Sequence, residues 1–95
     1  MSDEASWQVR IALAPEEANA IERAMLTGEI LPWERYAVRL PRPDDESAPA
    51  LLIEIRAQSH EAAEVEGARI YSRAREVAGL PPAPALILEI GRAHV

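Results

Sequence analysis

The chain has 95 residues and a formal net charge of −6, with sixteen acidic residues, ten arginines, no lysine and no cysteine. The lack of cysteine excludes a disulfide framework, a zinc–thiolate site and a thiol nucleophile. The acidity argues against a general nucleic-acid binder, because affinity for phosphate backbones comes from concentrated positive charge.

The length and the 48% hydrophobic content indicate a single folded domain over residues 1–95. We expect flexible tails at residues 1–5 and 92–95. The acidic N-terminus lacks the pattern of a signal peptide, and no apolar run approaches the roughly 18 residues of a membrane span. We therefore expect a soluble, cytoplasmic protein.

The first third of the sequence predicts a strand followed by a helix. Apolar residues alternate with polar or small ones over residues 7–13, which is typical of a strand with one buried face. Pro15 suits the first position of a helix, and Glu16 and Glu17 suit its first turn, where the helix dipole favours negative charge. Gly28 is well placed to end this helix.

The middle of the sequence predicts two strands joined by a loop. The first strand runs from about Trp33 to Leu40 and the second from about Ala50 to Ala57, again with alternating apolar residues. Residues 41–49 are polar and rich in proline, which indicates a loop. Because no helix separates the two strands, an antiparallel hairpin is the simplest connection.

The last third predicts a longer helix and a final strand. Ser59 is a good N-cap for a helix from about His60 to Ala78, which Gly79 would end. Gly67 lies inside this helix, and its lack of a side chain would let the backbone approach its support closely. The apolar residues 85–90 predict a final strand.

The order β-α-β-β-α-β predicts an α+β fold, a ferredoxin-like two-layer sandwich. Its four-stranded antiparallel sheet would have the order 4-1-3-2, with both helices on one face. This arrangement hosts many unrelated functions, so the fold alone does not indicate one.

Side-chain alternation then divides the strands into a face beneath the helices and an open face. The expected helix-facing residues are Trp7, Val9, Ile11, Leu13, Tyr36, Val38, Leu40, Leu51, Ile53, Ile55, Leu86, Leu88 and Ile90. The expected outward residues are Gln8, Arg10, Ala12, Trp33, Arg35, Ala37, Arg39, Leu52, Glu54, Arg56, Ile87 and Glu89. The outward set carries four arginines and two glutamates, a charge of +2, which leaves −8 on the rest of the chain.

This outward face allows three interpretations. It is a solvated surface held by cross-strand charge pairs, or a docking surface for a second copy or a protein partner, or a site for an anionic ligand or single-stranded nucleic acid. The expected central strands carry no outward aromatic residue for base stacking, which counts against RNA. The candidate binding residues are Arg10, Trp33, Arg35, Arg39, Leu52, Arg56 and Ile87.

Residues that could carry catalysis or bind a metal form no recognisable site. His60 and Glu64 lie at i, i+4 on a predicted helix, but a metal site needs three or four ligands. The contiguous acids at 44–46 lack the alternate spacing of a calcium loop. No serine lies in a nucleophile motif and no glycine-rich phosphate loop occurs. We expect no cofactor and no metal, and we favour a non-catalytic protein over an enzyme.

We therefore expect a small acidic interaction or assembly module that associates with itself, as a homodimer, or with a protein partner through the open sheet face. The alternative is a dimeric binding protein or enzyme that encloses an anionic small molecule between two arginine-lined sheets. A further alternative, an acidic mimic acting through the rest of the surface, rests only on net charge.

Overall fold

The computed structural model describes residues 4–40 and 48–92. Along the chain the elements are β1 (Ala5–Ala12), α1 (Ala18–Leu26), the 3-10 helix η1 (Trp33–Arg35), β2 (Tyr36–Arg39), β3 (Ala50–Ala57), α2 (His60–Ala78) and β4 (Ile87–Arg92). None of the helices in these two ranges combines the length and the apolar character that a membrane span requires.

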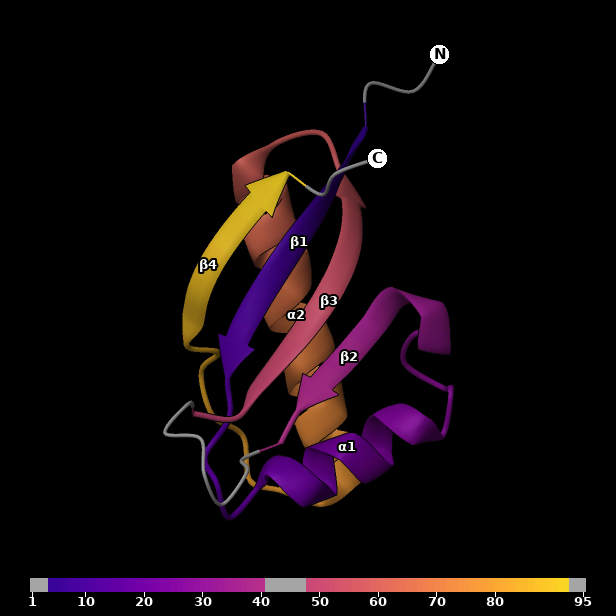
Figure 1. Cartoon of the computed structure of the whole chain (residues 1–95), viewed down its shortest axis with the longest axis vertical. Coiled ribbons are helices and arrows are strands. Elements are labelled where there is room, and N and C mark those ends of the chain that lie inside the picture. The colour runs from indigo at the N-terminus through magenta and orange to yellow at the C-terminus, as the bar shows by residue number, and fades with distance from the viewer. Residues whose placement is uncertain (1–3, 41–47, 93–95) are drawn as a thin grey trace.

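The four strands form one antiparallel sheet in the order β2-β3-β1-β4 (Figure 1). This confirms the predicted α+β class and the order 4-1-3-2, counted from the other edge. β1 pairs with β3 along its whole length, from Ala5 opposite Ala57 to Ala12 opposite Ala50. Ala5 and Arg92 belong to strands, where we expected flexible tails. Residues 1–3, 93–95 and 41–47 of the expected tails and loop lie outside the described residues.

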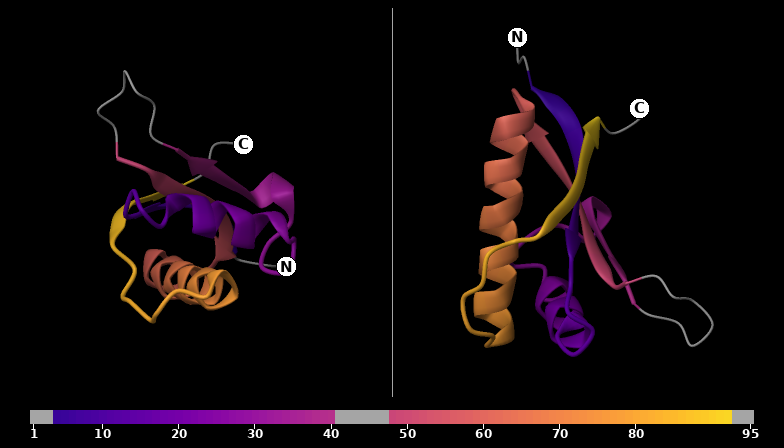
Figure 2. Two further views of the ribbon diagram at one scale, coloured as in Figure 1. Left: turned by 90° about the horizontal axis from the view of Figure 1, so that it is seen from below. Right: turned by 90° about the vertical axis from the view of Figure 1, so that its left-hand side faces the viewer.

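Both helices lie on the same side of the sheet (Figure 2). α2 runs along the sheet and contacts β1, β3 and β4, whereas the short α1 crosses the C-terminal end of α2 (Figure 1). α2 has the predicted bounds because local signals set both ends. The Ser59 hydroxyl accepts the N–H of Ala62 at 3.1 Å, and Gly79 adopts a left-handed φ of 75°.

The core lies between α2 and the sheet, with its centre on β1 and β3. Val9, Ile11 and Ile53 are fully buried there. Gly67 of α2 faces β1 so closely that a Cβ atom at this position would lie 3.1 Å from Cγ1 of Val9. The predicted role of Gly67, close approach of the helix backbone, is therefore confirmed.

A buried arginine, which the sequence analysis did not single out, joins the two helices. Arg75 is only 4% exposed, and its guanidinium donates to Glu17 at the start of α1 (2.7 and 3.3 Å) and to the Tyr71 hydroxyl (3.0 Å). Its Nε donates to the Pro81 carbonyl at 2.7 Å, in the segment that leads to β4. The hydrogen bond from Arg75, opposed by desolvation, lowers the pKa of Glu17 below its ordinary value.

The region before β2 differs from the prediction. Trp33 does not begin a strand: Arg35 donates its N–H to the Pro32 carbonyl at 3.0 Å, which closes the single turn η1, and β2 starts only at Tyr36. α1 likewise begins at Ala18, after a turn over residues 15–17. Both elements are shorter than their apolar patterns indicate.

The alternation predicted for the last strand is wrong at residues 86–88. Arg10 pairs with Glu89, but its neighbour Ile11 pairs with Ile87, so that Leu88 is an extra residue in a β-bulge. Ile87 therefore shares a face with the buried Ile11 and packs against the core, which removes it from the open face. Leu86 and Leu88, which we expected beneath the helices, are 65% and 50% exposed.

Candidate functional site

The sheet face opposite the helices is the candidate site, and Figure 1 views it from its uncovered side. We call this surface the open face. The strand register and the burial pattern assign to it Ser6, Gln8, Arg10, Ala12, Ala37, Arg39, Leu52, Glu54, Arg56, Glu89 and Gly91. The register also places Ala50 on this face, between Ala12 and Arg39, but Ala50 is fully buried. The other residues are at least partly exposed, whereas the residues that alternate with them along β1 and β3 form the core.

A shallow hollow of about 390 Å³ lies where β3, β1 and β4 meet on this face. Arg10 sits at its centre, directly opposite Leu52 on one side and Glu89 on the other. Gly91 lies opposite Gln8 and contributes no side chain, and a Cβ there would contact nothing within 4 Å. The gap left by Gly91 therefore helps to open the hollow, which Arg92 also borders.

The arginines of the open face keep their hydrogen-bonding capacity. Within residues 4–40 and 48–92, no carboxylate lies within 4.0 Å of the guanidinium of Arg10, Arg39 or Arg56. Arg35 differs, because its Nη2 donates to the backbone carbonyl of Glu54 at 3.0 Å. Arg35 thus holds η1 against β3, while the other three guanidinium groups can bind an incoming group.

The three available arginines do not converge on one point. With about 4.8 Å between strands and about 3.4 Å per residue, the Cα atoms of Arg10 and Arg39 are about 12 Å apart and those of Arg10 and Arg56 about 14 Å. Only Arg10 of the predicted arginines lines the hollow. The face is therefore a dispersed set of donors, unlike a pocket in which several cations surround one small anion.

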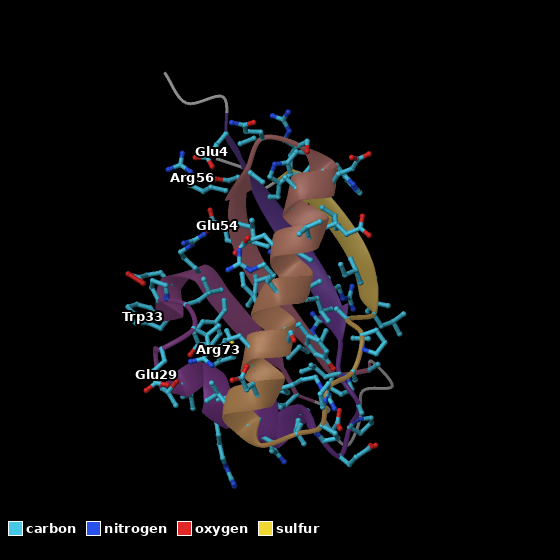
Figure 3. All side chains as sticks on the ribbon, turned by 180° about the vertical axis from the view of Figure 1, so that it is seen from behind. Glu4, Glu29, Trp33, Glu54, Arg56 and Arg73 are labelled. Carbon is cyan, nitrogen blue, oxygen red and sulfur yellow. The ribbon has the colours of Figure 1, made fainter. Side chains whose placement is uncertain are left out.

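Trp33 borders the open face instead of lying within it. Its side chain is 77% exposed, on η1 at the β2 edge of the sheet. Figure 3 shows Trp33, Glu54 and Arg56 on one side of the molecule, with β4 on the opposite side. The structure thus brings Arg10 and Leu52 together, places Arg39 and Arg56 on the same face, leaves Trp33 at its border, and turns Ile87 toward the helices.

The residues considered for metal binding form no cluster where the structure describes them. The ring of His60 meets that of Trp7 edge-on, with 5.9 Å between the ring centroids. In the described ranges no group of three or more His, Cys, Asp or Glu side chains could hold a metal ion. The acidic residues 44–46 lie outside these ranges.

Comparison with known proteins gives no family and no neighbour. No protein-family model, curated protein or solved structure significantly matches the chain.

Proposed function

We propose that the protein is a non-catalytic docking module whose open face binds an acidic surface of a protein partner. The observation that carries this proposal is the dispersion of Arg10, Arg39 and Arg56 across the uncovered sheet face. Arg39 and Arg56 are about 21 Å apart on the strand geometry, a span that suits a protein interface of roughly 800 Å² per partner.

The composition of the face supports the same conclusion. Arginine is enriched in protein interfaces, where its planar group makes several hydrogen bonds to carboxylates. Leu52 supplies an apolar contact beside Arg10, and the exposed Trp33 lies at the border, where a large partner would cover it. Complementary charge would accelerate association and select acidic partners.

A second copy of the chain is the next candidate. Arg10 and Glu89 lie directly opposite each other on β1 and β4, so a two-fold axis through this part of the face would allow Arg10 of one copy to pair with Glu89 of the other. The enclosed anionic small molecule has less support, because three of the four predicted arginines lie outside the hollow.

We also propose the ferredoxin-like arrangement for the fold, which the element order and the strand order support. The crossing of α1 over the end of α2 would be its main departure from helices packed side by side. A cytoplasmic location remains a prediction from the cysteine-free sequence.

Charge reversal tests the docking proposal. The test variant is Arg10→Glu/Arg39→Glu/Arg56→Glu, and the control variant, Arg23→Glu/Arg69→Glu/Arg73→Glu, has the same net charge but changes exposed helix residues. We would titrate each isotope-labelled protein with a peptide of alternating Glu and Leu residues and follow the backbone amide resonances.

The proposal predicts chemical-shift changes confined to β1, β2 and β3 in the unmodified protein and in the control variant, and their loss in the test variant. Changes centred on α2, or equal weakening in both variants, would contradict it and indicate a solvated face. Sedimentation at high concentration distinguishes a second copy from a partner protein as the occupant of the open face. Only the second-copy alternative predicts that the unmodified protein is a dimer and that the test variant is a monomer.

A further inference from the structure

The outer edge of β4 is a second surface with unused binding capacity. β4 is an edge strand that pairs only with β1, so alternate residues direct their N–H and C=O groups away from the sheet. The strand spans Ile87–Arg92, longer than the opposite edge strand β2 at Tyr36–Arg39. This edge is therefore the better template for an additional strand.

A groove of about 270 Å³ follows this edge on the helix side of the sheet. Its lining residues are His60 and Glu64 of α2 and Ile87, Leu88, Glu89 and Ile90 of β4. The bulge places Leu88 in the groove wall, where half of its surface remains exposed. The contact between His60 and Trp7 joins the start of α2 to β1. The groove thus combines apolar walls with the Glu64 carboxylate, and Glu89, whose side chain lies on the open face, borders it at the sheet edge.

The residues that line the groove and the β4 edge define which sequence an added strand should have. Side chains of an added strand alternate between the two faces of the sheet. A residue beside Glu89 would lie on the open face, where a cation gains a cross-strand partner. A residue beside Ile90 would lie on the helix side, against Leu88 and Ile90. The groove therefore suits alternate basic and apolar residues.

A second copy of β4 fits this edge poorly. A two-fold axis normal to the sheet and centred on Glu89 would place the two Glu89 carboxylates directly opposite each other. An axis centred on Ile90 would place Glu89 opposite Gly91 and the two carboxylates on a diagonal, still within reach of one another. Like charges in these positions destabilise the pairing, so a basic segment of another protein is the better occupant.

We infer that the β4 edge and its groove bind an extended segment of a partner protein, with alternating basic and apolar residues, as a fifth strand of the sheet. This site shares Glu89 with the open face, but its backbone groups and Leu88 lie at the sheet edge, and it does not depend on the function proposed for the open face. Backbone hydrogen bonds supply the affinity, and Glu89 and Leu88 select the sequence.

Labelled peptides test this inference by fluorescence anisotropy. The probe alternates Val and Arg over six residues, one control peptide replaces Arg with Glu, and a second carries N-methyl groups on alternate amides, which removes the hydrogen bonds that a strand edge accepts. We expect the Val–Arg peptide to bind and both control peptides to bind at least about tenfold more weakly.

Variants of the full chain locate the binding site. Glu89→Arg should weaken the Val–Arg peptide about tenfold and strengthen the Val–Glu peptide, because the cross-strand charge pair changes sign. Leu88→Lys should weaken both, whereas Glu29→Arg, an exposed charge change on the α1 side of the molecule, should change neither. Circular dichroism confirms that each variant is folded.

Four outcomes would overturn the inference, and three of them concern peptide binding. These are no binding at peptide concentrations up to about 1 mM, equal binding of the N-methylated peptide, and equal effects of Glu89→Arg and Glu29→Arg. A dimer of the unmodified protein that Leu88→Lys dissociates would also overturn it, because it would show that a second copy occupies the edge. Loss of binding to the acidic peptide at the open face would leave this inference unaffected.

Discussion

Gly67 allows a direct measurement of how closely α2 lies on the sheet. Replacing glycine with alanine inside a helix stabilises it by about 1 kcal/mol through intrinsic propensity. Here the new Cβ would lie 3.1 Å from Cγ1 of Val9 and 3.6 Å from Cδ1 of Ile55. The first distance is shorter than the 3.5–4.0 Å optimum for carbon contacts, and overpacking of this kind costs about 1–3 kcal/mol.

We therefore expect Gly67→Ala to lower the free energy of unfolding by about 1 kcal/mol, the difference between an overpacking cost of about 2 kcal/mol and the helix gain. Val9→Ala removes the clashing methyl group and by itself should cost about 2–3 kcal/mol. In the Val9→Ala background, Gly67→Ala should instead stabilise by about 1 kcal/mol, because only ordinary contacts remain, with Cδ1 of Ile55 at 3.6 Å and with the Cβ atom of residue 9 at 3.7 Å.

The two substitutions should thus show a coupling free energy of about 2 kcal/mol, which urea unfolding followed by circular dichroism can measure. A Gly67→Ala effect that is the same in both backgrounds to within about 0.5 kcal/mol would refute the close approach of α2 to β1. Stabilisation by Gly67→Ala alone would show that Val9 moves aside without cost.

Three further predictions concern the ends of the helices. Because Arg75 lowers the pKa of Glu17 in the folded state, this carboxylate stabilises the fold above its ordinary pKa of 4.5, and the contribution is lost as the pH falls through the lowered value. Urea midpoints measured from neutral to acidic pH should therefore fall less steeply below about pH 4.5 in Glu17→Gln than in the control Glu16→Gln, because Glu16 is exposed. Equal slopes in the two variants would contradict the stabilising role of the Glu17–Arg75 pair. Ser59→Ala should lower the free energy of unfolding by about 1 kcal/mol through loss of the N-cap, while the exposed Ser72→Ala in the helix interior should not lower it. Gly79→Ala should cost about 1–2 kcal/mol in the same assay, because its φ of 75° strains any residue with a Cβ.

The features predicted correctly from the sequence depend on local signals. Ser59 and Gly79 lie next to the ends of α2, so the bounds of this helix follow from capping chemistry alone. The strand order follows from the succession of elements, because a hairpin between β2 and β3 and the two helical connections leave few arrangements. The alternation of Val9, Ile11 and Ile53 placed the core on the correct face.

The features that the sequence did not predict depend on contacts between distant residues. Glu17 and Arg75 are 58 positions apart, and each also fits the helix dipole as a surface residue. The turn at Trp33 competes with a strand, and the Pro32 carbonyl, which accepts the Arg35 N–H, favours the turn. The guanidinium of Arg35 then reaches the Glu54 carbonyl, which removes it from the set of available arginines.

The bulge at Leu88 explains why the candidate site was only partly predicted. Residues 85–90 are apolar at both even and odd positions, so their pattern does not define which side chains face the helices. The register against β1 decides instead, and it shifts between Arg10 and Ile11. This one-residue shift turns Ile87 from the open face toward the helices, where it packs against the core, and places Leu88 in the groove beside α2. The same irregularity therefore removes one apolar side chain, Ile87, from the open face and adds another, Leu88, to the wall of the groove.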